Sequence, residues 1–204
     1  MADIQYNFIN LPSRIEFENG HVISYLYDAD GIKLRTTHII GSDTTVTDYC
    51  GNVIYENGIP VKLLTEAGYV TLADSKYHYF VQDHLGNNRV VVDQSGNVEE
   101  VNHYYPFGGL LSSSVSNAVQ PYKYNGKELD RKNGLDWYDY GARMYDAALG
   151  RWHAVDPMSE KYYSISSYVY GLNTPHNCID PDGQKIIFVN GYLGFGSPRG
   201  GGTY

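Results

Sequence analysis

The sequence predicts an all-β fold in which repeated antiparallel β-hairpins form a sheet, followed by an irregular, aromatic-rich segment. Tyrosine, a residue that favours β-sheet surfaces, occurs 21 times against 6 phenylalanines and 2 tryptophans. The 22 glycines provide residues for tight turns. From Leu11 to Tyr105, short runs of valine, isoleucine, threonine and tyrosine alternate with turn residues. This alternation is typical of an all-β meander.

The hairpins can be placed along the chain from these runs. Strands are expected at residues 14–17, 22–27, 33–40, 53–56, 61–64, 69–72, 77–82, 88–93 and 98–104. Between them stand the dipeptides Asn19-Gly20, Asp30-Gly31, Asn57-Gly58, Leu85-Gly86 and Ser95-Gly96. Glycine adopts positive φ at little cost, and asparagine or aspartate before it tolerates the same region, so these pairs favour hairpin turns.

Two of the hairpins look like imperfect copies of one unit, at residues 21–36 and 77–93. In each, an alternating strand meets a turn that begins Asp-x-x-Gly, and a second alternating strand with a basic residue follows. A single hairpin cannot bury its apolar face in water. Repetition therefore predicts neighbouring hairpins that pair into an extended sheet.

The regular pattern ends near Tyr104. There follow YYPFGG, then YKYNGKELD at residues 122–130, then an aromatic stretch at residues 134–157 and the segment SYVYGLNTPHNCIDPDGQ at residues 167–184. After it, KIIFVNGYLG is expected to form a buried strand followed by a glycine turn, and the glycine-rich end of the chain is expected to be mobile.

Charge and composition exclude several classes of function. The net charge is −8 and no run of lysine or arginine exceeds two residues, so the basic surface of a nucleic-acid-binding protein is missing. No segment approaches 18 apolar residues, so membrane insertion is not predicted. No segment near the N-terminus resembles a signal peptide, so no export signal is predicted in this chain. Cys50 and Cys178 allow at most one disulfide within the chain.

Taken together, the hairpins, QDHLGNNR, PFGG, YDYGARMYDAALGRWHAVDP and PHNCIDPDG resemble, in this order, the RHS repeat-associated core of Rhs/YD-repeat proteins. In that family, YD repeats form a β-spiral shell around a hollow, the core closes one end, and a variable C-terminal region, often a toxin, is carried inside. The resemblance implies three parts: YD-type hairpin repeats at residues 1–103, the core at 104–184, and a short variable tail at 185–204, a truncated effector region.

The resemblance also implies self-cleavage, because several relatives cut themselves after a Pro-x4-Asp-Pro-x-Gly-Leu motif. The matching cleavage motif here consists of Pro175, Asp180, Pro181, Gly183 and Gln184, with Gln184 where leucine is usual. A second Asp-Pro pair is Asp156-Pro157, followed by Met158-Ser159 in place of the usual x-Gly.

Asp156 and Asp180 are the candidate catalytic residues, with Arg143 and Arg151 as candidate supports for their carboxylates. Two aspartates held close together share a proton, which leaves one as a base for water and the other as an acid. The alternative is that Asp-Pro-x-Gly is simply a turn in which the aspartate caps its own backbone. The sequence leaves both interpretations open.

Other polar residues give weaker indications. His78, His84 and His103 match no metal-binding spacing and are expected to be polar strand residues, and the spacing of His176 and Cys178 fixes no catalytic geometry. The tail GFGSPRGGG lacks the lysine of a phosphate-binding loop. Neither a metal nor a cofactor is expected.

The leading hypothesis is a structural shell and delivery segment of an Rhs-type polymorphic toxin or cell-surface protein, self-cleaving at Gln184. The resemblance implies export or surface attachment, and as partners the rest of a YD array, a C-terminal cargo, and immunity or secretion-system proteins. One alternative is a tyrosine-rich sheet that binds glycans or a partner protein. Another, a hydrolase that acts on an external substrate, needs a preformed pocket.

Overall fold

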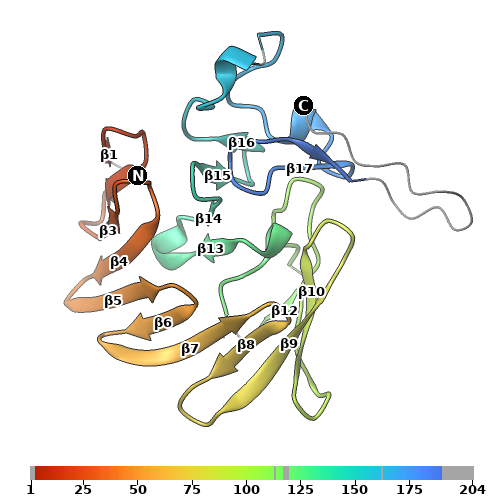
Figure 1. Cartoon of the computed structure of the whole chain (residues 1–204). Coiled ribbons are helices and arrows are strands. Elements are labelled where there is room, and N and C mark those ends of the chain that lie inside the picture. Colours follow the sequence, from red (N-terminus) through yellow and green to blue (C-terminus); the bar gives the residue numbers. More distant parts are fainter. Residues whose placement is uncertain (1–2, 113, 117–119, 162, 190–204) are drawn as a thin grey trace, which may run out of the picture. The chain divides into compact units, whose positions relative to one another are not determined.

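The computed structural model describes residues 3–112, 114–116, 120–161 and 163–189, and consists of strands and short 3-10 helices. Twelve strands form one sheet in which each strand lies beside its neighbours in the chain (Figure 1). They are β1 (Asp3–Tyr6), β2 (Pro12–Glu16), β3 (Val22–Tyr27), β4 (Lys33–Ile40), β5 (Asp43–Cys50), β6 (Val53–Glu56), β7 (Ile59–Thr65), β8 (Gly68–Thr71), β9 (Lys76–Gln82), β10 (Asn88–Asp93), β11 (Val98–Val101) and β12 (Val115–Ser116).

The predicted all-β meander is confirmed, and each expected strand coincides with a strand of this sheet. The glycines of the five expected turn dipeptides all have positive φ, between 78° and 84°. Strands β1 and β5 were not among those expected, although Gly41-Ser42 before β5, with Gly41 at a φ of 62°, is a glycine-first hairpin pair. Strand β11 ends at Val101, three residues earlier than expected.

Contacts divide the chain into two units. The first comprises Met1–Phe80, Val91–Glu99 and Arg131–Leu135, and the second comprises Val81–Val90, Glu100–Asp130 and Asp136–Tyr204. Within the first unit, Ile23 of β3 lies opposite Ile15 of β2 and His38 of β4, and Tyr25 lies opposite Thr36. All five side chains are buried, so strand register creates one buried face.

The repeated turns share one hydrogen-bond pattern, which supports the interpretation of the hairpins as copies of one unit. The Oδ1 atoms of Asp28, Asp83 and Asp93 each accept the N–H groups two and four residues ahead, at distances between 2.8 and 3.1 Å. The aspartate side chain thus supplies an acceptor for N–H groups of the turn.

The second unit contains two smaller sheets. One joins β13 (Glu128–Asp130), β14 (Trp137–Asp139), β15 (Met144–Asp146) and β16 (Arg151–Trp152), and the other joins β17 (Cys178–Ile179) and β18 (Ile187–Phe188). The 3-10 helices of the chain are η1 (Tyr124–Gly126), η2 (Lys132–Gly134), η3 (Ser159–Lys161) and η4 (Gly171–Asn173). In the part of the chain that the structure describes, no helix has the length and apolar character needed to cross a membrane.

An aromatic core fills the second unit. Its buried members are Tyr124, Leu129, Tyr138, Tyr140, Tyr145, Trp152 and Tyr170. Three of the hydroxyls donate to successive carbonyls of the PFGG element: Tyr124 to Pro106 at 3.0 Å, Tyr145 to Phe107 at 2.8 Å, and Tyr138 to Gly108 at 2.9 Å. Buried tyrosines require such partners. The PFGG element and the aromatic stretch therefore form one structural element.

Candidate functional site

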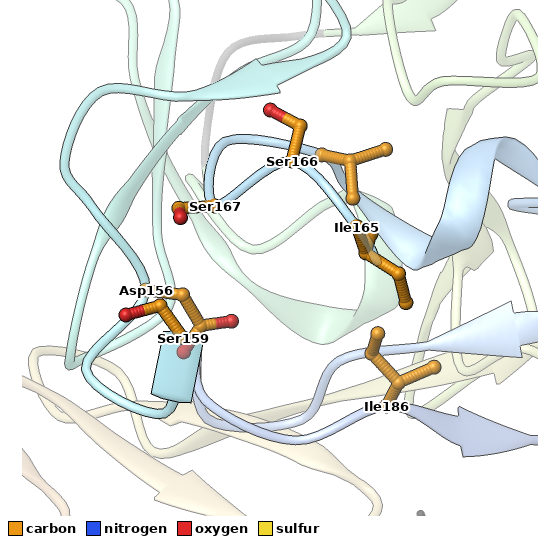
Figure 2. A pocket seen from close by; sticks show the side chains of 7 residues that line it. Asp156, Ser159, Ile165, Ser166, Ser167 and Ile186 are labelled. Carbon is orange, nitrogen blue, oxygen red and sulfur yellow. The ribbon is translucent and has the colours of Figure 1, made fainter. Parts of the chain in front are cut away.

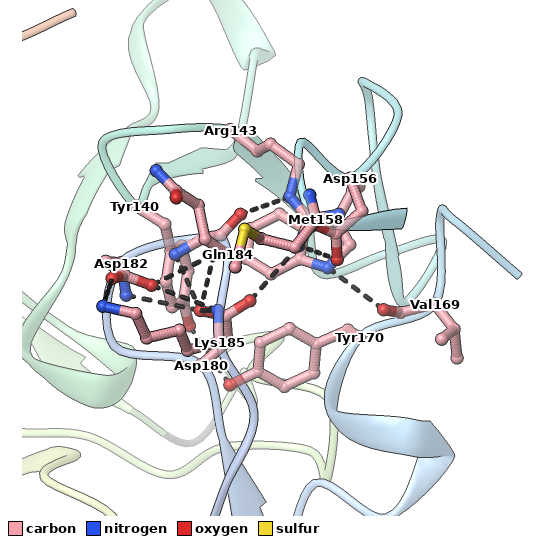
Figure 3. A network of polar contacts seen from close by, with 12 residues as sticks. Tyr140, Arg143, Asp156, Met158, Val169, Tyr170, Asp180, Asp182, Gln184 and Lys185 are labelled. Carbon is pink, nitrogen blue, oxygen red and sulfur yellow. Dashed lines mark hydrogen bonds and ion pairs between the residues drawn. The ribbon is translucent and has the colours of Figure 1, made fainter. Parts of the chain in front are cut away.

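The ends of three strands place the candidate residues in the second unit (Figure 3). Arg143 directly precedes β15, Asp156 lies four residues beyond the end of β16, and Asp180 directly follows β17. The Arg143 side chain is 2% exposed and that of Asp180 1%. The predicted pair of aspartates and one of the two predicted arginines thus lie in a single buried cluster.

Arg143 is the centre of this cluster. Its Nη2 donates to Asp156 Oδ2 at 3.0 Å and to Asp180 Oδ2 at 3.3 Å. Its Nε donates to the Gly183 carbonyl at 2.5 Å, and its Nη1 donates to the Ser167 carbonyl at 3.2 Å. One guanidinium therefore links both carboxylates to the backbone of the cleavage motif, instead of forming a two-pronged bond with one carboxylate.

The surroundings of Arg143 affect its charge in opposite ways. Burial lowers the pKa of Arg143, whereas Asp156 and Asp180 raise it. The guanidinium also lies over the ring of Trp152, 4.2 Å from its centroid. Since a buried carboxylate is costly unless paired, Arg143 makes it possible for two of them to lie together.

Asp180 uses its two carboxyl oxygens differently. Oδ1 accepts the N–H groups of the four residues that follow Pro181, at distances between 2.7 and 3.3 Å. Oδ2 faces Arg143. Burial raises the pKa of Asp180 to about 6, although Arg143 and these N–H groups lower it. Asp180 can therefore cap the turn with Oδ1 and still belong to the cluster around Arg143 through Oδ2.

Asp156 borders a small pocket that is partly open to solvent and whose lining side chains are drawn in Figure 2. Its Oδ1 accepts the N–H of Met158 at 2.7 Å. The lining residues are Asp156, Ser159, Ile165, Ser166, Ser167, Val169 and Ile186. Ile186 is the second residue after Gln184, so the pocket contacts both one candidate aspartate and the segment that follows the cleavage motif.

The structure places the other motif residues as follows. Pro175 is buried in the turn before β17, Pro181 is exposed, and Gln184 is half-buried with its N–H bonded to Asp180 and Asp182. Gly183 has a φ of +79°, and a Cβ added there would lie 3.1 Å from the backbone nitrogen of Arg143. This position therefore requires glycine.

Arg151 does not take part in the contacts that the structure shows around Arg143. It lies on β16 with an exposed side chain, and its backbone bridges to Val169. Another basic residue contacts the cleavage motif instead: Lys127 Nζ donates to the Pro181 carbonyl at 2.5 Å. No sequence signal marks Lys127, which follows an ordinary Asn-Gly turn.

The remaining candidates lie elsewhere. His78 is buried, with Nδ1 2.6 Å from Glu99 and Nε2 2.8 Å from Thr71, whereas His84 contacts the His176 carbonyl at 3.4 Å. His103 bonds Ser114 through its backbone. Among the described residues, no three potential ligands are grouped so that they could hold a metal ion.

Cys178 begins β17, two residues before Asp180, but the described contact of its thiol is with Thr174 and not with the cluster. Cys178 is buried, with its Sγ 3.4 Å from Thr174 Oγ1, while the neighbouring His176 is exposed. Residues 190–204, which include the whole glycine-rich tail, lie outside the described part of the chain. Of the buried strand expected before them, Ile187–Phe188 forms β18, which is half-buried.

Comparison with known proteins explains this combination of a meander and an aromatic core. The model of the Teneurin YD-shell family matches residues 63–175, more than half of the chain. The chain belongs to the Teneurin YD-shell family. It is thus a YD-shell segment, as the resemblance to Rhs/YD-repeat proteins implied.

Relatives and solved structures agree with this assignment. Salivary gland surface protein 1 of Aedes aegypti is 32% identical over 91% of this chain and 6% of its own length. Toxin subunit YenC2 of Yersinia entomophaga is 36% identical over 47% of this chain and 10% of its own length. The crystal structure of TcdB2-TccC3-Cdc42 has a TM-score of 0.75 at 20% identity, over 89% of this chain and 10% of that one. The chain therefore spans a small fraction of these proteins.

Proposed function

We propose that this YD-shell segment belongs to a longer Rhs-type toxin or surface protein and helps to enclose a C-terminal cargo. The support is family membership, together with relatives that are far longer and include a toxin subunit and a surface protein. In this proposal residues 1–103 are shell repeats, 104–184 are the core that closes the shell, and 185–204 begin the cargo. Its partners are the rest of the array, the cargo and other toxin components, and the protein is exported or held at the cell surface.

The core also cuts the chain between Gln184 and Lys185 in this proposal. Asp156 removes a proton from water, and the hydroxide attacks the carbonyl carbon of Gln184. The bond from that carbon to the Lys185 nitrogen breaks, and Asp180 gives its proton to the nitrogen. The new carboxylic acid at Gln184 passes its proton back to Asp180 and becomes a carboxylate, Lys185 becomes a new amino terminus, and Asp156 returns its proton to solvent.

The observation that carries this mechanism is the position of Asp180. Its Oδ1 lies 3.2 Å from the Lys185 nitrogen, which would be the leaving group, and burial raises its pKa to about 6. A carboxyl group with such a pKa can donate a proton near neutral pH. Asp156 shares Arg143 with it and borders a pocket open to water. The pair therefore has distinct acid and base roles.

The substitution Asp180→Asn tests the mechanism against the turn-only alternative. Asparagine keeps the Oδ1 acceptor of the turn but cannot supply the proton. We expect the intact mass of the wild-type chain to fall with time, and the mass of Asp180→Asn and Asp156→Asn to remain constant. The matched control is Asp182→Asn, since Asp182 also accepts the Lys185 N–H at 3.2 Å but is only half-buried, and this variant should cleave at the wild-type rate. Cleavage of Asp180→Asn at the wild-type rate would exclude the mechanism.

A tyrosine-based binding surface is the second candidate function. Tyr77 and Tyr79 of β9 are 51% and 42% exposed, and their rings stack with centroids 6.4 Å apart. Paired aromatic faces of this kind suit sugar rings or an apolar partner surface. The test is binding of the chain to a glycan array, with Tyr77→Ala as the comparison. No binding, or equal binding by both proteins, would remove this candidate.

A further inference from the structure

The carbonyl groups of the cleavage loop are held one after another by donors from outside the loop. Lys127 Nζ donates to the carbonyl of residue 181 at 2.5 Å, the Ala142 N–H to that of residue 182 at 3.2 Å, and Arg143 Nε to that of residue 183 at 2.5 Å. Two of these donors belong to the segment that carries the arginine of the cluster. The third, Lys127, lies more than fifty residues from the loop in sequence.

We propose that Lys127 is a positioning residue for the self-cleavage described above: it fixes the Pro181 end of the loop so that Asp180 faces the bond to be cut. This inference rests on the proposed function. Since Pro181 directly follows Asp180, a shift of its carbonyl moves the backbone from which the Asp180 side chain extends. A displacement of about 1 Å in such an arrangement can lower a rate by about a hundredfold.

Lys127 is itself held in place on its own side. Its N–H donates to the Tyr124 carbonyl at 2.9 Å, and its carbonyl accepts the Lys123 N–H at 2.8 Å. Its ammonium group lies over the ring of Tyr140, 5.2 Å from the centroid. Tyr140 is fixed in turn, because its hydroxyl donates to Asn125 Oδ1 at 2.7 Å. The lysine therefore links the aromatic core to the cleavage loop.

The charge of Lys127 also acts on the loop. The acidic groups around it are Asp139 at the end of β14 and Asp180 and Asp182 of the loop, all of which raise its pKa, whereas burial lowers it. By the same attraction, the ammonium favours the ionised form of Asp180. Loss of this charge should therefore shift the protonation of Asp180 to higher pH, an effect that a purely structural contact would not have.

The experiment measures self-cleavage of the full chain across pH. We expect Lys127→Met to slow cleavage at the pH optimum by about tenfold or more, consistent with a lost charged hydrogen bond. We also expect the fall in rate at high pH to begin at a higher pH than in the wild type. Lys127→Arg keeps both donor and charge and should recover most of the rate. Lys76→Met is the control, since it removes an exposed lysine paired with Asp74.

A second measurement separates this proposal from the proposed function. In an Asp156→Asn chain, which should stay intact, hydrogen exchange at the amides of Gln184 and Lys185 reports on the loop directly. Adding Lys127→Met should speed their exchange by about tenfold, since their bonds to Asp180 loosen. Unchanged exchange, or a pH profile identical to the wild type, would overturn the role of Lys127. An intact wild-type chain would overturn self-cleavage instead, and exchange would still decide whether Lys127 fixes the loop.

Discussion

The amide nitrogen of Lys185 lies 3.2 Å from Oδ1 of Asp180, so the buried carboxyl group that caps the turn also contacts the proposed leaving group. The Asp28, Asp83 and Asp93 turns of the hairpins use the same type of cap. What distinguishes Asp180 is that it is buried and that its second oxygen faces Arg143. Burial and the contact with Arg143 therefore give the carboxyl group of this turn a different chemistry from those of the hairpin turns.

Removal of Arg143 should destabilise the protein strongly. Arg143→Met leaves Asp156 and Asp180 without their shared partner, and breaking a buried ion pair in this way costs about 3–5 kcal/mol. Urea unfolding measures this loss of free energy. Arg151→Met is the matched control, because that side chain is exposed, and it should change the free energy by less than about 0.5 kcal/mol. Equal effects of the two substitutions would show that the cluster does not stabilise the core.

The rate of self-cleavage should depend on pH in a definite direction. Because burial raises the pKa of Asp180 to about 6, the acid is mostly protonated below pH 6 and loses its proton above it. The rate should therefore fall by about tenfold for each pH unit above this value. Intact mass recorded over time from pH 5 to pH 9 gives the profile. A rate that keeps rising through this range would mean that Asp180 does not act as the acid.

Substitution of Gly108 should be more costly than that of a glycine in an open turn. Gly108 has a φ of +89°, and a Cβ added there would lie 2.6 Å from the ring of Tyr124. Gly20 has a φ of +79° and no atom near an added Cβ. We expect Gly20→Ala to cost about 1 kcal/mol from backbone strain, and Gly108→Ala about 1–3 kcal/mol more from the clash. Thermal unfolding of both variants compares them, and similar melting temperatures would contradict the packing described for PFGG.

The sequence predicted the sheet well because its signals are local. Asn19-Gly20 and Asn57-Gly58 mark their hairpins by the backbone conformations they allow, and alternation marks the strands. Strand β5 was missed although Gly41-Ser42 before it is a glycine-first pair that also favours a hairpin turn. The buried face that Ile23 forms with His38 follows from register, which becomes evident only when the strands are paired.

The candidate site was predictable only in part. The family resemblance indicated the Asp156 and Asp180 pair, the chemistry of arginine indicated Arg143 and Arg151, and the structure brings Arg143 to both aspartates but not Arg151. The contact of Lys127 with Pro181 joins residues far apart in the chain. No motif in the sequence around either residue predicts this contact. The tyrosine hydroxyls bound by PFGG could not be foreseen for the same reason, since tyrosine in a β-rich sequence usually indicates only a sheet surface.

The position of the cut is the most direct test of the account. The full chain is incubated at pH 6, and the amino termini present at the start and after incubation are identified by terminal sequencing and mass. The account predicts one new amino terminus, at Lys185, that appears in the wild-type chain and not in Asp180→Asn. A chain that stays intact, or a new terminus at any other residue, would contradict it.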